Sequence, residues 1–213
     1  MTWSDVSIGQ WIELQALRKD FEDSVIDAYT YRIGIIDVLF NIDSSSLPFI
    51  EFQKYVDATD FLTQKYNPQP VKATYTVDGT VYRLLTDVST MTTSQYIDYM
   101  KFMELGDDTN LPYLMALLLI PEGKTYGDGY DVGTTAEVFK THLTVDIMLN
   151  ISFFFRELLR LCTRDLVFCS IQEATKELKV SNLPMEQRQE VIRRLAELRA
   201  LIPSAGGGDG LYG

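Results

Sequence analysis

One stretch, Val71–Phe102, constrains the fold more than any other part of this 213-residue chain. At its centre lies Asp78-Gly79, a pair that suits a two-residue type I′ turn because both central residues of that turn need φ > 0. With this turn, Tyr75 lies opposite Tyr82 and the two rings share one face of the strand pair. We therefore predict a β-hairpin near residues 72–85.

A helix is predicted directly after the hairpin. Thr92 or Thr93 can cap its start, because a hydroxyl there can accept a hydrogen bond from an orphan backbone N–H. The apolar residues that recur at helical spacing are Tyr96, Ile97, Met100 and Met103. Since a lone hairpin is only marginally stable in water, we expect this helix to pack against the hairpin.

The periodicity on either side of this unit is mostly helical. The expected helices run from a cap at Ser4 or Asp5 to about Tyr29, then over Ile33–Ile42, Ser46–Leu62, Leu111–Ile120, Ala136–Leu143 (capped by Thr134 or Thr135), Val145–Lys179 and Met185–Ile202. The predicted fold class is mainly α, of the α+β type: a helical bundle with one small β-hairpin. Two domains are expected, a helical core over 1–180 and a C-terminal helix with a glycine-rich tail over 181–213.

Charge and hydropathy exclude several kinds of partner. The net charge is −11, which argues against nucleic acid and against anionic membranes, because both favour clusters of Lys and Arg. The longest apolar runs, Leu111–Ile120 and Ile147–Phe155, are shorter than the roughly 20 residues that span a bilayer. The N-terminus lacks the basic and apolar pattern of a signal peptide, so synthesis in the cytoplasm is expected. Cys162 and Cys169 are then expected to be buried thiols.

The sequence lacks a recognisable catalytic or metal-binding set. His142 is the only histidine, and with two cysteines it cannot supply a typical zinc site. Gly123-Lys124-Thr125 resembles the end of a P-loop, but Leu118 stands where the loop requires its first glycine. We predict no enzyme activity and no cofactor. The alternative is an acidic active site at Asp128 and Asp131, which requires their carboxylates to converge in a cleft.

The remaining candidates for function are surfaces. Arg156, Arg160 and Arg164 form a basic stripe at i,i+4 spacing, either for a partner or for ion pairs within the chain. A glycine-rich loop, Pro121–Gly133, carries two tyrosines, and we expect exposed apolar groups in this loop or on the last two helices. The candidate partner-binding residues are Tyr126, Tyr130, Arg156, Arg160, Arg164, Leu195, Leu198, Leu211 and Tyr212.

A short internal similarity links two predicted helix starts. Ser7-Ile8-Gly9-Gln10 and the residues after it resemble Thr92-Thr93-Ser94-Gln95 and its continuation, and each is followed by an aromatic residue, Ile and an acid. A single pair does not indicate a repeat, and chance or shared capping rules account for it.

Three segments resemble the tail assembly chaperones of long-tailed bacteriophages. They are TYTVDGTVYRLL…TTSQYIDYMKF, the apolar helix running into a Pro-x-Gly-Lys-x-Tyr loop in LPYLMALLLIPEGKTYGDGYD, and the aromatic helix ISFFFRELL. The resemblance covers roughly Trp3–Leu159. Members of that family are small helical proteins that bind the tape measure protein and keep it soluble during tail assembly.

The resemblance implies a non-enzymatic protein that works by contact with other phage structural proteins in an oligomeric assembly. It would be either a virion component of the tail, neck or ring, or a tail assembly chaperone. Its place would be the host cytoplasm during assembly, with incorporation into the virion in the first case. The alternative is a helical adaptor or binding module without a viral role.

Overall fold

The computed structural model describes residues 1–160 together with Gln189 and Arg193. The chain divides into two compact units, Met1–Phe154 and Phe155–Gly213, and the fold below is that of the first unit. It is mainly helical with one small antiparallel sheet, so the predicted fold class is confirmed. The predicted domain boundary after residue 180 lies outside the described residues.

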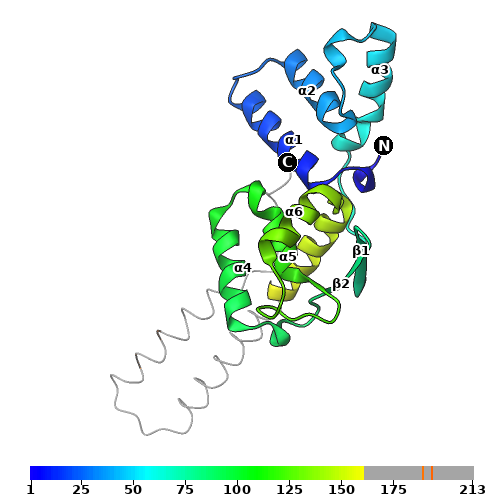
Figure 1. The fold of residues 1–213 in the computed structure, drawn as a ribbon. Helices are drawn as coiled ribbons and strands as arrows, with labels where there is room; N and C mark the ends of the chain where they lie inside the picture. The colour runs from blue at the N-terminus through cyan, green and yellow to red at the C-terminus, as the bar shows by residue number, and fades with distance from the viewer. Residues whose placement is uncertain (161–188, 190–192, 194–213) are drawn as a thin grey trace, which may run out of the picture. The chain divides into compact units, whose positions relative to one another are not determined.

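The helices of the first unit alternate with short turns and one strand cluster (Figure 1). The α-helices are α1 (Ile8–Glu22), α2 (Ala28–Phe40), α3 (Phe49–Ala58), α4 (Thr93–Leu105), α5 (Leu111–Leu118) and α6 (Val132–His142), and residues 145–160 are also helical. The strands are β1 (Thr74–Val77), β2 (Thr80–Leu84) and β3 (Leu119–Pro121). Single 3-10 turns occur at Trp3–Asp5, Ser44–Ser46, Asp60–Thr63, Val88–Thr90 and Asp108–Asn110.

The N-terminal helix boundaries differ from the prediction. Ser7, not Ser4 or Asp5, caps α1, in a capping box with Gln10. The helix ends at Glu22 instead of continuing to Tyr29, because Ser24 adopts a left-handed conformation with φ 59°. Asp27 then caps α2 through a hydrogen bond from the Thr30 N–H.

Three other predicted helices also change length or start. Gly34 lies inside α2 and does not interrupt it; it leaves room for the Leu17 side chain of α1. The predicted helix Ser46–Leu62 is shorter, because α3 ends at Ala58 and a 3-10 turn follows. Asp131, three residues before the predicted Thr134, caps α6.

The predicted hairpin is confirmed with its register. Tyr75 pairs with Tyr82 and Val77 with Thr80, and Asp78 and Gly79 both have positive φ, at 45° and 73°. The sheet also has a third strand, β3, where the sequence predicted the end of a helix. Its residue Ile120 pairs with Arg83 of β2, so the strand order is β1-β2-β3.

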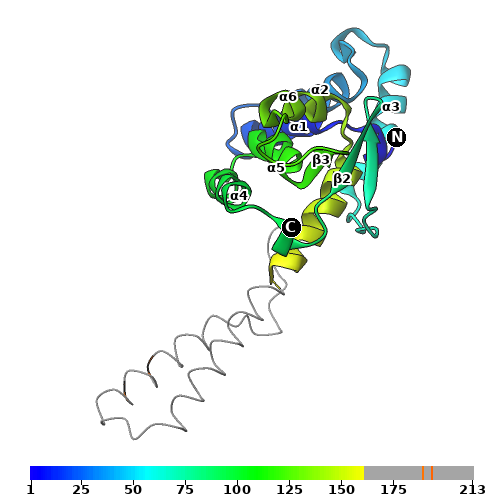
Figure 2. The ribbon, with the colours of Figure 1, turned by 60° about the horizontal axis from the view of Figure 1, so that its bottom comes forward.

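The expected packing of α4 against the hairpin is wrong. Instead α4 packs on α5, and the hairpin lies on the other side of α5 in both views (Figures 1 and 2). Tyr82 of the hairpin contacts the ring of Phe139 in α6, with centroids 4.8 Å apart. The hairpin is therefore stabilised by β3 and α6.

Helix α5 forms the centre of the core. It packs most extensively against α6, and its residues 114–118 are all buried. A helix this apolar on every side must be surrounded by other elements, because each exposed methylene costs roughly 0.8 kcal/mol relative to a buried one.

Candidate functional site

The C-terminus of α5 is buried, and its last carbonyl groups need donors from elsewhere. Four segments supply them. The Leu119 N–H donates to the Met115 carbonyl, and the Leu85 N–H donates to the Leu118 carbonyl at 2.8 Å. The other two donors are side chains: Gln95 Nε2 of α4 reaches the Leu117 carbonyl at 2.6 Å, and the Tyr130 hydroxyl reaches the Ala116 carbonyl.

Tyr126 and Tyr130 of the predicted binding loop therefore have structural partners. The Tyr126 hydroxyl donates to the Asp98 carboxylate of α4. Burial, together with the hydrogen bond to Asp98 and its negative charge, raises the pKa of Tyr126 to about 12. Burial also raises the pKa of Tyr130. Both hydroxyls thus stay protonated and tie the loop to α4 and α5.

The acidic residues of the loop do not form the active site of the alternative hypothesis. Asp131 is used as the cap of α6, where its carboxylate accepts from the Thr134 N–H at 2.9 Å, and Asp128 is exposed. His142 is an exposed residue of the last turn of α6. Within the residues that the structure describes, no group of three His, Cys, Asp or Glu side chains could hold a metal ion.

Two of the candidate arginines are described. Arg156 is exposed, and so is Arg160. Arg160 forms an exposed bidentate pair with Glu157 of the same helix, at 2.8 Å and 2.6 Å. The other candidates lie outside the described residues: Arg164, Leu195, Leu198, Leu211 and Tyr212. Cys162 and Cys169 lie there too.

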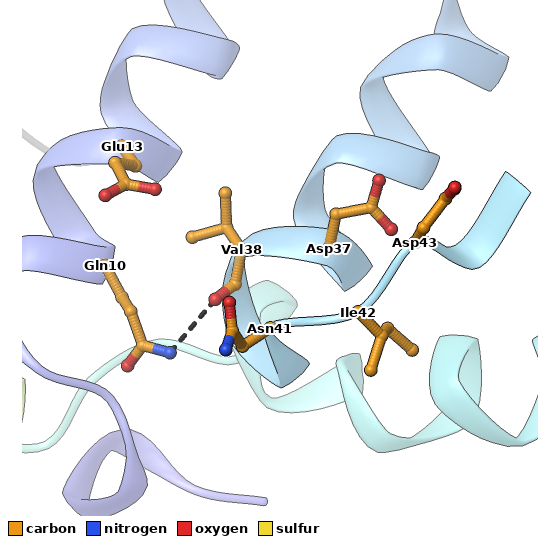
Figure 3. Close-up of a pocket in the computed structure, with 7 residues that line it drawn as sticks. All are labelled: Gln10, Glu13, Asp37, Val38, Asn41, Ile42 and Asp43. Atoms are coloured by element: carbon orange, nitrogen blue, oxygen red, sulfur yellow. Dashed lines mark hydrogen bonds between the residues drawn. The ribbon is translucent and has the colours of Figure 1, made fainter.

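An open hollow of about 670 Å³ lies between α1 and the end of α2 (Figure 3). Its acidic lining residues are Glu13 of α1, Asp37 of α2 and Asp43 of the segment after α2. Asp37 accepts the Ser44 N–H at 2.7 Å and Asp43 accepts the Ser45 hydroxyl at 2.5 Å. Two of the three carboxylates therefore serve the local turn, and the hollow is open to solvent.

Gln10 lines the same hollow and performs the role that Gln95 performs at α5. Its Nε2 donates to the Val38 carbonyl at 3.0 Å and to the Leu39 carbonyl at 3.2 Å, which closes the end of α2. Gln10 and Gln95 each stand three residues after a hydroxyl cap, Ser7 or Thr92. The similarity between the two sequence segments thus reflects shared capping and a shared use of the glutamine side chain.

The apolar stripe of α4 faces away from the core, contrary to expectation. Ile97 is 59% exposed, Met103 49% and Tyr96 44%. The buried face of the helix is formed by Gln95 and Tyr99, and Phe102 stacks on Tyr113 with centroids 5.2 Å apart. We name the outward residues Tyr96, Ile97, Met100 and Met103 the α4 stripe.

A second exposed apolar group lies on α3, where Phe49 is 77% and Ile50 74% exposed. The sequence pattern did not single these residues out; their only signal was two adjacent apolar residues directly after Pro48. By contrast, no large apolar side chain of residues 121–134 is among the exposed ones. Of the two places expected to expose apolar groups, the loop therefore does not, and the last two helices lie wholly or partly outside the described residues.

Comparisons with protein-family models, with curated proteins and with solved structures found no match to this chain. In the described part of the chain, none of the helices combines the length and the apolar character needed to cross a membrane.

Proposed function

We propose that this protein is a non-enzymatic structural or assembly protein of a tailed bacteriophage that acts through protein–protein contacts. Either it is a component of the virion, in the tail, neck or ring, or it is a tail assembly chaperone. The viral assignment rests on the resemblance of the hairpin-helix, apolar helix-loop and aromatic helix segments to the chaperone family.

The observation that carries the contact role is the α4 stripe. Two of its four residues, Ile97 and Met103, are about half exposed or more, and a helix normally turns such an apolar row toward its neighbours. Met and aromatic residues are enriched at protein interfaces, because their side chains adapt to a partner and bury a large apolar area. A partner that covers the stripe would remove this area from water.

A helical adaptor or binding module without a viral role is the second candidate. It is favoured by the same surface, since an exposed apolar row supports binding whatever the genome that encodes it. The two candidates differ in where the protein is found, not in the chemistry of its surface.

Mass spectrometry of purified, intact phage particles from the genome that encodes this chain tests the viral role. A virion component is expected among the particle proteins at a fixed copy number. A chaperone is expected to be absent from particles and to co-purify from infected cells with a long helical tail protein. Absence from both, or a gene without phage genes beside it, would reject both viral forms and leave the adaptor.

A further inference from the structure

The two outer edges of the sheet differ in how many backbone groups are available to bond a further strand. On the outer edge of β3, the Leu119 N–H already donates to the Met115 carbonyl. Pro121 has no N–H, and its carbonyl accepts from the Lys124 N–H at 3.0 Å. Three of the four outward groups of this edge are therefore missing or already bonded, which blocks a further strand, as is common for strands that must not pair further.

The outer edge of β1 is open. The Leu84 N–H donates to the Ala73 carbonyl at 2.9 Å, which fixes the alternation: residues 73, 75 and 77 point their backbone groups toward β2, and Thr74 and Thr76 point theirs away. Within the described part of the chain, no hydrogen bond from or to the backbone of Thr74 or Thr76 closes this edge. Both threonines are exposed, so four backbone groups are available to a further strand.

We propose that this edge pairs with β1 of a second copy of the chain, antiparallel and about a two-fold axis at Tyr75. Only this register places Thr74 opposite Thr76 of the second copy and Thr76 opposite its Thr74, so that all four outward groups of each copy are bonded. Two three-stranded sheets then become one continuous sheet.

The side chains favour a second copy over an unrelated strand. On the exposed face, the register gives two Thr–Thr pairs, which are favourable cross-strand neighbours. It also brings Lys72, two residues before β1, toward the end of the second strand where Asp78 follows β1, and Asp78 toward the second Lys72, whereas a register displaced to bring the two Asp78 residues together would set like charges side by side. An exposed ion pair adds little affinity, but here it selects the register. The pairing rests on backbone geometry and does not depend on the proposed viral role.

The test uses the full-length chain, with sedimentation analysis over a range of concentrations and amide hydrogen exchange by NMR. The natural protein is expected to dimerise, and the Thr74 and Thr76 amides are expected to become protected as dimer forms, while the Tyr75 and Val77 amides are protected at all concentrations. Thr76→Pro removes one outward N–H, which edge strands tolerate. It deletes two hydrogen bonds per dimer and should raise the dissociation constant about 30-fold.

Thr76→Ala is the matched control, because it also loses the hydroxyl but keeps the N–H; its dissociation constant should stay within about threefold of the natural one. Lys72→Glu leaves the backbone intact and should weaken the dimer by setting acids opposite each other. Protection of Tyr75 and Val77 in Thr76→Pro verifies that the hairpin still forms. A monomer at all concentrations, a dimer with unprotected Thr74 and Thr76 amides, or protection of these amides only by a different protein would overturn the proposal.

Discussion

Single glutamine side chains satisfy the last carbonyl groups of two helices of the first unit, α2 and α5. Gln10 and Gln95 each extend from the first turn of one helix to the last carbonyls of another. An unpaired buried carbonyl costs about 1–3 kcal/mol, so each glutamine fixes the position of its own helix relative to the one it caps. This explains why Gln95, a polar residue, is 2% exposed while the apolar Ile97 faces solvent.

Two of the helical glycines, Gly9 and Gly34, should respond differently to alanine. A Cβ at Gly9 would lie 2.9 Å from the backbone oxygen of Lys140, which cannot move without shifting α6. The atoms nearest to a Cβ at Gly34 would be the Leu17 methyl groups, at 2.9 and 3.0 Å, and a leucine side chain can rotate. We expect Gly9→Ala to lower the free energy of unfolding by about 1–3 kcal/mol. Gly34→Ala should change it by less than about 1 kcal/mol, because the gain in helix propensity offsets the contact.

Urea denaturation followed by circular dichroism measures both variants. Equal destabilisation by the two alanines would contradict the difference between a backbone and a side-chain neighbour.

Tyr126 makes the stability sensitive to high pH. Its pKa is raised from 10.0 to about 12 in the folded protein, so the unfolded chain loses this proton first as the pH rises. The stabilisation from the Tyr126–Asp98 hydrogen bond is therefore complete below pH 10 and lost as the pH approaches 12. We expect Tyr126→Phe to be less stable than the natural protein by about 1 kcal/mol near neutral pH, and this difference should shrink at alkaline pH.

Denaturation at about pH 8 and about pH 11 tests the linkage. Tyr96→Phe is the control for loss of a tyrosine hydroxyl, because the Tyr96 side chain is on the outward face of α4. If the free energy of unfolding of Tyr126→Phe differed from that of the natural protein by the same amount at both pH values, the folded structure would not raise the pKa of Tyr126.

At the scale of elements, local signals were predictable and packing was not. Asp78-Gly79 determined the hairpin and its register, and Thr92 marked the start of α4, because turns and caps depend on a few neighbouring residues. Strand β3 was not predicted because it begins within the continuously apolar run Leu111–Ile120. Such a run has no hydrophobic periodicity that distinguishes a buried helix from a buried strand. The outward α4 stripe was unpredictable, because periodicity shows that a helix has an apolar face but not what covers it. For the same reason, Tyr126 and Tyr130 were identified as candidates while their bonds to Asp98 and Ala116 were not.

The cap of α6 provides a test at this scale. Asp131→Ala removes the hydrogen bond to the Thr134 N–H and a negative charge at the helix N-terminus, so it should cost about 1 kcal/mol of stability. Asp131→Asn keeps the acceptor and should lose less. Asp128→Ala, three residues earlier on the exposed loop, should stay within about 0.5 kcal/mol of the natural protein. Thermal or urea unfolding gives all three values, and an equal effect at positions 128 and 131 would exclude the capping role.

At the scale of the whole molecule, the first unit buries its apolar residues on α5, α6 and the helix after Leu143, and leaves others uncovered on α3 and α4. The uncovered residues are not needed for the core of the first unit, because Gln95 and Tyr99 hold α4 on α5 from the opposite face. The packed face of α4 and the proposed contact surface therefore lie on different sides of the same helix, which allows substitutions to separate them.

The double variant Ile97→Glu with Met103→Glu should separate folding from function. Both side chains are exposed, so the free energy of unfolding should change by less than about 1 kcal/mol.

If the α4 stripe contacts another protein, two carboxylates buried without partners would abolish that contact. A phage lacking the natural gene and supplied with the variant should then fail to assemble infectious particles. Ser94→Glu with Lys101→Gln, on exposed positions of the same helix outside the stripe, makes the net charge more negative by the same amount and should support assembly. Normal assembly with the stripe variant would reject the α4 stripe as the contact surface, and failure with both variants would assign the loss to charge alone.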